Sequence, residues 1–234
     1  MEQYNRKPLK SFGQILSLQN YEKVAEGNEW TTKRKLVFAK KITESNDYCR
    51  VARDVKDAHI CYIDNLNNDF IYYLHLVLDS AIGRLQVCGN AASNGIINGF
   101  TSIKSLKDFP VVVVPNDIQK AASRLDQTIR AILEIFRENE DVQFIESARN
   151  FMFELRDYFV FELYAKELFE TNGIDIVNTF VSIIEDSEDT ELYALAPKIL
   201  ESVTNSDSAL LSNMRRFRVL IGKIVNNVEQ KPSI

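Results

Sequence analysis

The sequence predicts an α+β protein, in which a mixed α/β N-terminal half is followed by an all-helical C-terminal region. Before residue 115, short runs rich in β-branched and aromatic residues alternate with turn clusters, which is typical of strands and loops. From Ile118 onward, apolar residues recur at helical spacing. Hydrophobic residues make up 45% of the 234 residues, which is enough for a sizeable core. We therefore expect two domains, residues 1–117 and residues 118–234.

Two strands and a helix are predicted in the middle of the N-terminal half. Val, Ile and Tyr favour extended backbone in Cys49–Val55 and in Ala58–Ile63. The turn cluster at residues 65–69 is predicted to cap a helix over Phe70–Ser80, where apolar residues fall three and four positions apart.

A polar loop and a buried strand complete this half. Gly89–Gly99 reads GNAASNGIING and is predicted to be a loop, because Gly, Asn and Ser favour turns. Ile103–Leu106 and the run Val111–Val114, which lies between two prolines, are predicted to frame a buried strand.

The C-terminal half is predicted to contain several helices. The first begins at Ile118 with Asn116 or Asp117 as its cap, and Asn172-Gly173 is predicted to end the second. This second helix is predicted at Val142–Glu170. Three more are predicted at Ile174–Glu185, Glu188–Val203 and Ser208–Val228. The second helix holds eight aromatic residues, which indicates either a surface for a partner chain or burial within a bundle of one monomer.

Motifs of catalysis and cofactor binding are missing from the sequence. The three cysteines form no C-x-x-C pair and there are only two histidines, so a zinc site is not expected. Neither the phosphate-binding loop, nor the dinucleotide fingerprint, nor the common hydrolase and kinase signatures occur. We therefore expect no enzyme, no metal and no cofactor. The enzymatic alternative is a metal-dependent nuclease cluster of Asp64, Asp69 and Asp79 with Lys104.

The sequence also predicts a soluble, cytoplasmic protein. No stretch approaches the roughly 20 apolar residues that cross a bilayer. Residues 1–10 lack the apolar core of a signal peptide, and an odd number of cysteines suits a reducing compartment. No membrane partner is expected.

Charge is divided unevenly between the two halves. Residues 1–120 carry 16 Lys/Arg and 13 Asp/Glu, whereas residues 121–234 carry 12 and 20. Within the first half, one segment is basic and contains no acidic residue: Lys33, Arg34, Lys35, Lys40 and Lys41. Such a segment in an acidic protein suits a polyanion-binding face, and a solvated strand or helix face is the alternative.

The segment 69–129 resembles a known family. Its order of elements is similar to the second half of a target-recognition domain from the DNA-specificity subunits of type I restriction-modification systems. The opening LKSFGQILSL at Leu9–Leu18 is also similar to the start of such domains. The matching elements are Phe70–Ser80, Gly89–Ser93, Ile103 with Leu106, Val111–Pro115, Gln119, and Leu125-Asp126 with Ile129.

This resemblance implies a non-catalytic DNA-recognition module. Its partners would be double-stranded DNA and a DNA methylase or restriction subunit, with homodimerisation or subunit docking through the helices. It also resembles a specificity domain that works beside an N6-adenine DNA methylase. Gln119 is expected to have a structural role, to cap or to brace its helix.

The DNA-binding residues are expected in two places. The basic segment would contact phosphates, with Trp30 beside it, and the loop after Gly89 would offer short polar groups. The predicted residues are Trp30, Lys33, Arg34, Lys35, Lys40, Lys41, Asn90, Ser93 and Asn94. For Trp30 the alternative is a core anchor, and for the loop it is a simple turn.

The alternative function is a protein-interaction or scaffold protein that keeps the recognition-domain fold without reading DNA.

Overall fold

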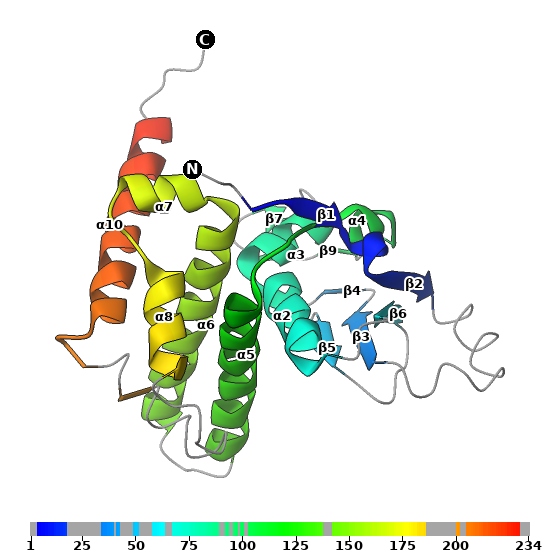
Figure 1. Ribbon diagram of the computed structural model, residues 1–234, viewed down its shortest axis with the longest axis horizontal. Coiled ribbons are helices and arrows are strands. Elements are labelled where there is room, and N and C mark those ends of the chain that lie inside the picture. The colour runs from blue at the N-terminus through cyan, green and yellow to red at the C-terminus, as the bar shows by residue number, and fades with distance from the viewer. Residues whose placement is uncertain are drawn as a thin grey trace. The chain divides into compact units, whose positions relative to one another are not determined.

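The N-terminal half of the chain mixes strands with helices and the C-terminal half is helical, as the sequence predicts. In the computed structural model every described strand ends by Val112, and every described element from Asn116 onward is a helix (Figure 1). The structure describes residues 4–17, 34–39, 41–42, 49–51, 58–63, 67–88, 92–93, 96–97, 99–100, 103–137, 142–185, 200–201 and 205–229. The α+β class is therefore confirmed. Among the described helices, none has the length and apolar character to cross a bilayer.

The chain forms two units, residues 4–126 and residues from Gln127 onward. The division falls within helix α5 (Asn116–Arg137), and the boundary predicted after residue 117 lies in the same helix. Each unit has its own buried core.

The first unit contains a four-stranded antiparallel sheet. Its order is β2-β6-β3-β5, formed by β2 (Gly13–Ser17), β6 (Ala58–Ile63), β3 (Arg34–Ala39) and β5 (Cys49–Val51). Leu36 of β3 pairs with Cys61 of β6 on one side and with Val51 of β5 on the other. The strand predicted at Ala58–Ile63 is confirmed. Of the strand predicted at Cys49–Val55, residues 49–51 form β5 and the rest lies outside the described residues.

Two further strand pairs are short. β4 (Lys41–Ile42) pairs with β9 (Gly99–Phe100), and β7 (Ala92–Ser93) pairs with β8 (Ile96–Ile97). The described residues between Gly89 and Gly99 are therefore paired strands rather than the loop expected there. The dipeptide Asn94-Gly95 is a hairpin signal in the sequence that this expectation overlooked.

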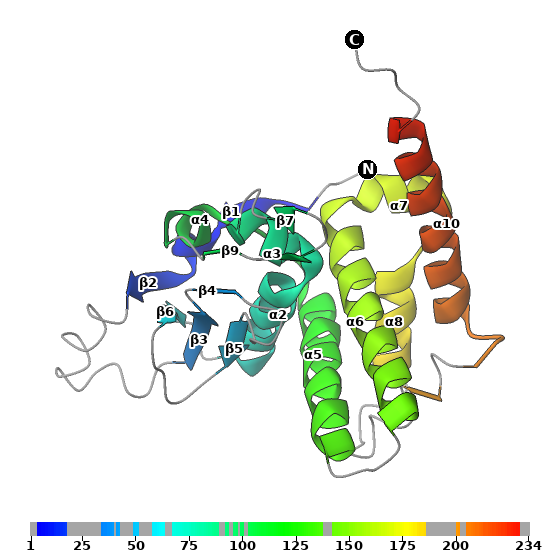
Figure 2. The same cartoon turned by 180° about the vertical axis from the view of Figure 1, so that it is seen from behind.

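Helix α2 (Asn68–Asp79) forms the core of the first unit. Asn67 caps it, because its side-chain oxygen accepts a hydrogen bond from the Asp69 amide at 2.9 Å, which confirms the predicted helix and its cap cluster. Strands β3 and β5 lie against α2, and α3 (Ala81–Cys88) follows it directly (Figure 2).

The segment at Ile103–Leu106 is helical, so the strand expectation there is wrong. These residues begin α4 (Ile103–Asp108), and the short strand β10 (Pro110–Val112) follows. Leu106 and Phe109, three residues apart, are both buried, and the Phe109 amide donates to the Leu106 carbonyl at 3.3 Å. A spacing of three places both side chains on one side of a helical turn, which a strand would not do.

Helix α5 begins at Asn116, two residues earlier than expected. The Gln119 amide donates to the Pro115 carbonyl at 3.0 Å, so Asn116 and Asp117 lie in the first turn and neither is the cap. The Gln119 side chain donates to the Val114 carbonyl at 3.0 Å, which confirms its bracing role. Buried Asp126 of α5 meets buried His75 of α2, with 2.6 Å between Oδ1 and Nδ1.

The second unit is a helical bundle in which α6, α8 and α10 lie side by side (Figures 1 and 2). The prediction of a single helix over Val142–Glu170 is wrong, because the helix is interrupted at Ala165. Its parts are α6 (Val142–Tyr164) and α7 (Lys166–Thr171), followed by α8 (Ile176–Glu185) and α10 (Ala209–Glu229). Of the helix predicted at Glu188–Val203, residues 200–201 are helical and the rest lies outside the described residues.

The interruption of the helix at Ala165 allows aromatic residues of α6 and α7 to pack against other helices of this unit. Phe169 of α7 stacks on Phe217 of α10, with ring centroids 4.4 Å apart, and Phe159 of α6 meets Phe180 of α8 at 6.0 Å. Phe159, Phe169, Phe180 and Phe217 are all buried. Phe159 and Phe169 of the predicted aromatic helix therefore lie in the core of this unit, whereas Phe151, Phe153 and Phe161 are half-buried.

Candidate nucleic-acid interface

The predicted DNA-binding residues are only partly described by the structure. Arg34 and Lys35 begin β3, Lys41 begins β4, and Ser93 ends β7. The other predicted residues lie outside the described residues: Trp30, Lys33, Lys40, Asn90 and Asn94.

The described basic residues of the predicted segment are spread along a strand. Arg34 and Lys35 are the first residues of β3, and Lys41 follows after the far end of that strand. At about 3.3 Å per residue, the six residues of β3 span roughly 17–20 Å. Strand β7, which carries Ser93, pairs with β8 in the described structure and not with β3 or β4. The structure thus gives a row of basic positions rather than one compact cluster.

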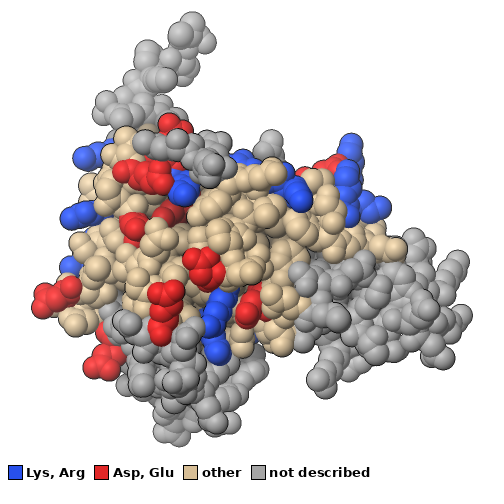
Figure 3. All heavy atoms as spheres, in the orientation of Figure 1, with Lys and Arg blue, Asp and Glu red and all other residues tan. Residues whose placement is uncertain are grey.

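A second group of cations lies in the same unit and was not predicted. It comprises five exposed residues from two distant segments, which we call the β1–α4 basic surface: Arg6, Lys7, Lys10, Lys104 and Lys107. The first three lie on β1 (Arg6–Pro8) and the 3₁₀ turn η1 (Leu9–Ser11), and the last two lie on α4. Figure 3 shows blue side chains gathered over this part of the unit.

Backbone pairing brings the two segments together. Strand β1 pairs antiparallel with β10, so that Lys7 lies opposite Val111. Immediately after the strand, the Leu9 amide donates to the Phe109 carbonyl at 2.8 Å. Leu9 and Leu106 are fully buried beneath the surface, while the lysines beside them in sequence are exposed. Apolar residues thus fix the positions from which the cations project.

The local charge is positive. The Asp108 carboxylate accepts a hydrogen bond from Lys10 Nζ at 2.8 Å. The hydrogen bond and charge of Lys10, with smaller contributions from the charges of Lys104 and Lys107, hold the pKa of Asp108 below its ordinary value. Asp108 therefore stays ionised at neutral pH and offsets the charge of one lysine, while Lys104 and Lys107 add further positive charge around it. Such a surface can attract and position a phosphate backbone.

Sequence reasoning missed this surface because its halves are almost a hundred residues apart. A partial signal exists, since residues 3–21 contain three Lys/Arg and no Asp/Glu. Nothing in the sequence places Lys104 and Lys107 beside them, because that proximity depends on the β1–β10 pairing.

The structure describes two of the three acidic residues of the nuclease alternative. Asp79 is paired with Arg84 Nη2 at 2.8 Å, Asp69 lies in the first turn of α2, and Asp64 lies outside the described residues. Within the described ranges, no three His, Cys, Asp or Glu side chains converge as metal ligands. The buried His75–Asp126 pair links two helices inside the core.

Comparison of the chain with family models, with curated proteins and with solved structures finds no match.

Proposed function

We propose that this protein is a non-catalytic DNA-recognition module that positions a DNA methylase or restriction partner on duplex DNA. The observation that carries the proposal is the β1–α4 basic surface, where five cations gather on one unit of an acidic protein. Duplex DNA presents closely spaced phosphates, and Lys and Arg side chains supply most of the contacts that position a protein on them.

The first unit also contains most of the elements on which the family resemblance rests. Helix α2, strand β10 and the bracing Gln119 belong to residues 4–126, together with the β1–α4 basic surface. The β1–α4 basic surface and the basic positions at Arg34, Lys35 and Lys41 would both hold phosphates. Base edges would be read by side chains between residues 20 and 60.

The helical unit would serve association with the partner subunit. Residues 121–234 carry an excess of acidic residues, 20 against 12 basic ones, which disfavours broad contact with phosphates. Docking of a methylase or restriction subunit, or pairing with a second copy of the chain, would therefore use this unit.

DNA binding by the full chain can be measured by fluorescence anisotropy on a random duplex pool across a salt series. The test variant is Lys104→Gln with Lys107→Gln, and the charge-matched control is Arg215→Gln with Lys223→Gln on α10. We expect the test variant to bind all sequences more weakly. If both lysines contact phosphates, its slope of log K against log salt should fall by about 1.8.

Sequencing of the retained duplexes separates recognition from simple phosphate binding. Enrichment of a short motif by the wild-type protein, unchanged in the control, is the expected result. Absence of binding even at low salt, or equal loss of affinity in both double variants, would contradict the proposal.

A scaffold role without DNA readout is the second candidate, and two exposed apolar residues of α10 favour it. Val219 is 59% exposed and Ile224 is 40% exposed, although both are large apolar side chains. A scaffold would form a stable dimer or partner complex in light scattering and show no salt-sensitive DNA binding. That outcome would replace the first proposal.

A further inference from the structure

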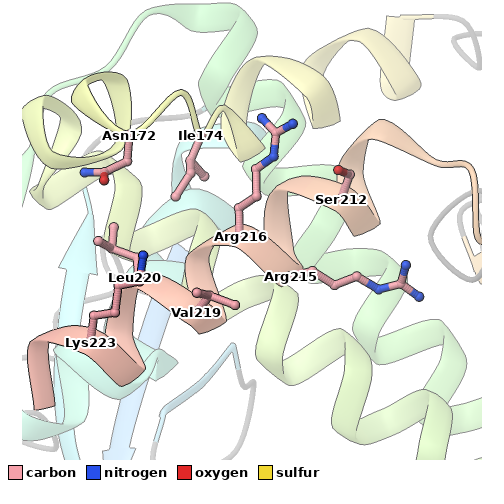
Figure 4. Close-up of a pocket in the computed structure, with 8 residues that line it drawn as sticks. All are labelled: Asn172, Ile174, Ser212, Arg215, Arg216, Val219, Leu220 and Lys223. Carbon is pink, nitrogen blue, oxygen red and sulfur yellow. The ribbon is translucent and has the colours of Figure 1, made fainter. Parts of the chain in front are cut away.

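The second unit contains a pocket of about 420 Å³ beside α10. One wall is a single face of that helix, since the lining residues are spaced three, one, three, one and three positions apart: Ser212, Arg215, Arg216, Val219, Leu220 and Lys223. The opposite wall is the turn between α7 and α8, which contributes Asn172 and Ile174 (Figure 4).

Both walls are held by packing elsewhere in the unit. Leu210, Met214 and Phe217 on the other face of α10 are buried, which directs the pocket face outward. The turn is closed by hydrogen bonds from the Gly173 amide to the Glu170 carbonyl at 3.1 Å and from the Ile174 amide to the Phe169 carbonyl at 3.0 Å. Gly173 has a φ of 63°, a backbone conformation that favours glycine. The pocket is thus preformed.

The pocket gathers positive charge within an acidic half of the chain. Residues 208–228 contain four Lys/Arg and no Asp/Glu. Arg218 is used internally, because it forms two hydrogen bonds with the Glu154 carboxylate at 3.0 and 2.6 Å. Arg215 and Lys223 are exposed lining residues and have no ion-pair partner among the described residues.

The third cation of the pocket is held in place. Arg216 Nη1 donates to the Gly173 carbonyl at 3.2 Å, which links α10 to the turn. Figure 4 shows the Arg216 side chain reaching from α10 towards Ile174, whereas Lys223 extends towards Asn172. An anion in the pocket would therefore be contacted by cationic donors from Arg216 and Lys223, which are two helical turns apart on α10.

The lining also has an apolar part. Ile174 is buried, Leu220 is half-buried and Val219 is exposed, and all three line the same pocket as the cations. Volumes of roughly 300–1,000 Å³ with apolar walls and a few polar groups are typical of sites for small ligands.

We propose that this pocket binds a small phosphomonoester whose phosphate is attached to an apolar body. A phosphomonoester carries about −1.5 to −2 charge near neutral pH, which suits three cations better than a single carboxylate would. Guanidinium groups match phosphate oxygens in geometry, and the apolar lining matches the attached group. This inference does not depend on DNA recognition.

Phenyl phosphate is the probe that tests the proposal, with inorganic phosphate and phenol as its two halves. Isothermal titration calorimetry on the full chain should give tighter binding for phenyl phosphate than for either half. Arg215→Gln with Lys223→Gln should weaken binding by about tenfold or more, because two charge-assisted contacts are lost. Lys104→Gln with Lys107→Gln removes the same charge outside the pocket and should leave the affinity unchanged.

Lys223→Arg keeps the charge and should retain binding, which separates loss of a contact from a change in the helix. Equal affinity of the two double variants for phenyl phosphate would overturn the proposal. Loss of DNA affinity in the pocket variant without loss of phenyl phosphate binding would also overturn it, because the pocket would then belong to a DNA interface.

Discussion

Glu162 is a buried carboxylate that links two helices of the second unit. One of its oxygens accepts from the Ile176 amide at 2.7 Å and from the Val177 amide at 3.2 Å, at the start of α8. Burial raises its pKa from 4.5 to about 7, even though the two backbone donors favour the charged form. The folded protein therefore binds a proton between pH 4.5 and about 7 that the unfolded chain releases.

This difference makes stability depend on pH in a definite direction. The contribution of protonated Glu162 to the free energy of unfolding is fully present below pH 4.5 and is lost as the pH rises to about 7. Glu162→Gln keeps an acceptor oxygen but cannot titrate. We expect the free energy of unfolding of the wild type to fall relative to this variant by on the order of 1–3 kcal/mol between pH 5 and 7.5.

Urea unfolding at several pH values measures this difference. Asp207→Asn removes an exposed acidic group of the same unit and serves as the control. Parallel stability curves for the wild type and Glu162→Gln would show that Glu162 titrates normally in the folded protein.

At the scale of elements, the junction between α2 and α3 depends on one glycine. Gly83 is buried, and a Cβ atom there would overlap the backbone carbonyl oxygens of Val77 and Leu78. Its amide donates to Ser80 Oγ at 3.2 Å, and that hydroxyl donates to the Val77 carbonyl at 2.6 Å. The close approach of α3 to the end of α2 therefore requires a residue without a side chain.

Two Gly→Ala substitutions should have opposite effects on stability. Gly83→Ala forces the two helices apart, and we expect it to lower the free energy of unfolding by about 2–4 kcal/mol. Gly222→Ala, in α10, meets no atom within 4 Å, and should raise stability by about 0.5–1 kcal/mol because alanine favours helix. Chemical denaturation of both variants tests the pair. A Gly83→Ala protein as stable as the wild type would contradict the packing described for α2 and α3.

At the scale of the whole molecule, the two units differ in the charge that they present. The net charge of −5 combines a basic first half and an acidic second half. A single average value would suggest that the protein repels DNA, whereas the β1–α4 basic surface gives one unit a local attraction. The proposed DNA binding should therefore protect exposed residues of the first unit only.

Lysine footprinting with mass spectrometry can show which unit contacts DNA. We expect duplex DNA to slow the labelling of Lys7, Lys10, Lys104 and Lys107, which are exposed in the first unit. The exposed Lys223 of the second unit should be labelled at the same rate with and without DNA. Addition of salt should abolish the protection, because counterion release drives phosphate binding. Protection of Lys223 alone would place the contact on the wrong unit for the proposed function.

Local patterns predicted many of the elements correctly. Asn67 caps α2 within the predicted cluster, Gln119 braces α5, and Gly173 ends α7 with a positive φ. Each of these features depends on interactions between residues at most five positions apart, so the sequence contains the full signal. Errors occurred where distant contacts decide the outcome. Ile103–Leu106 folds as a helical turn whose Leu106 is buried, with Leu9 held beside it by the backbone bond to Phe109.

The sequence by itself determined the α+β class, the cap of α2, the end of α7 at Gly173 and the uneven distribution of charge. Only the tertiary structure decided which cations share a surface. Lys10 and Lys104 are 94 residues apart in sequence, yet pairing of β1 with β10 places both around Asp108. The α10 pocket also depends on a distant turn, since Asn172 and Lys223 line it together. The physical reason is that periodicity and capping are local, whereas a binding surface is assembled by strand pairing and core packing between residues far apart in the chain.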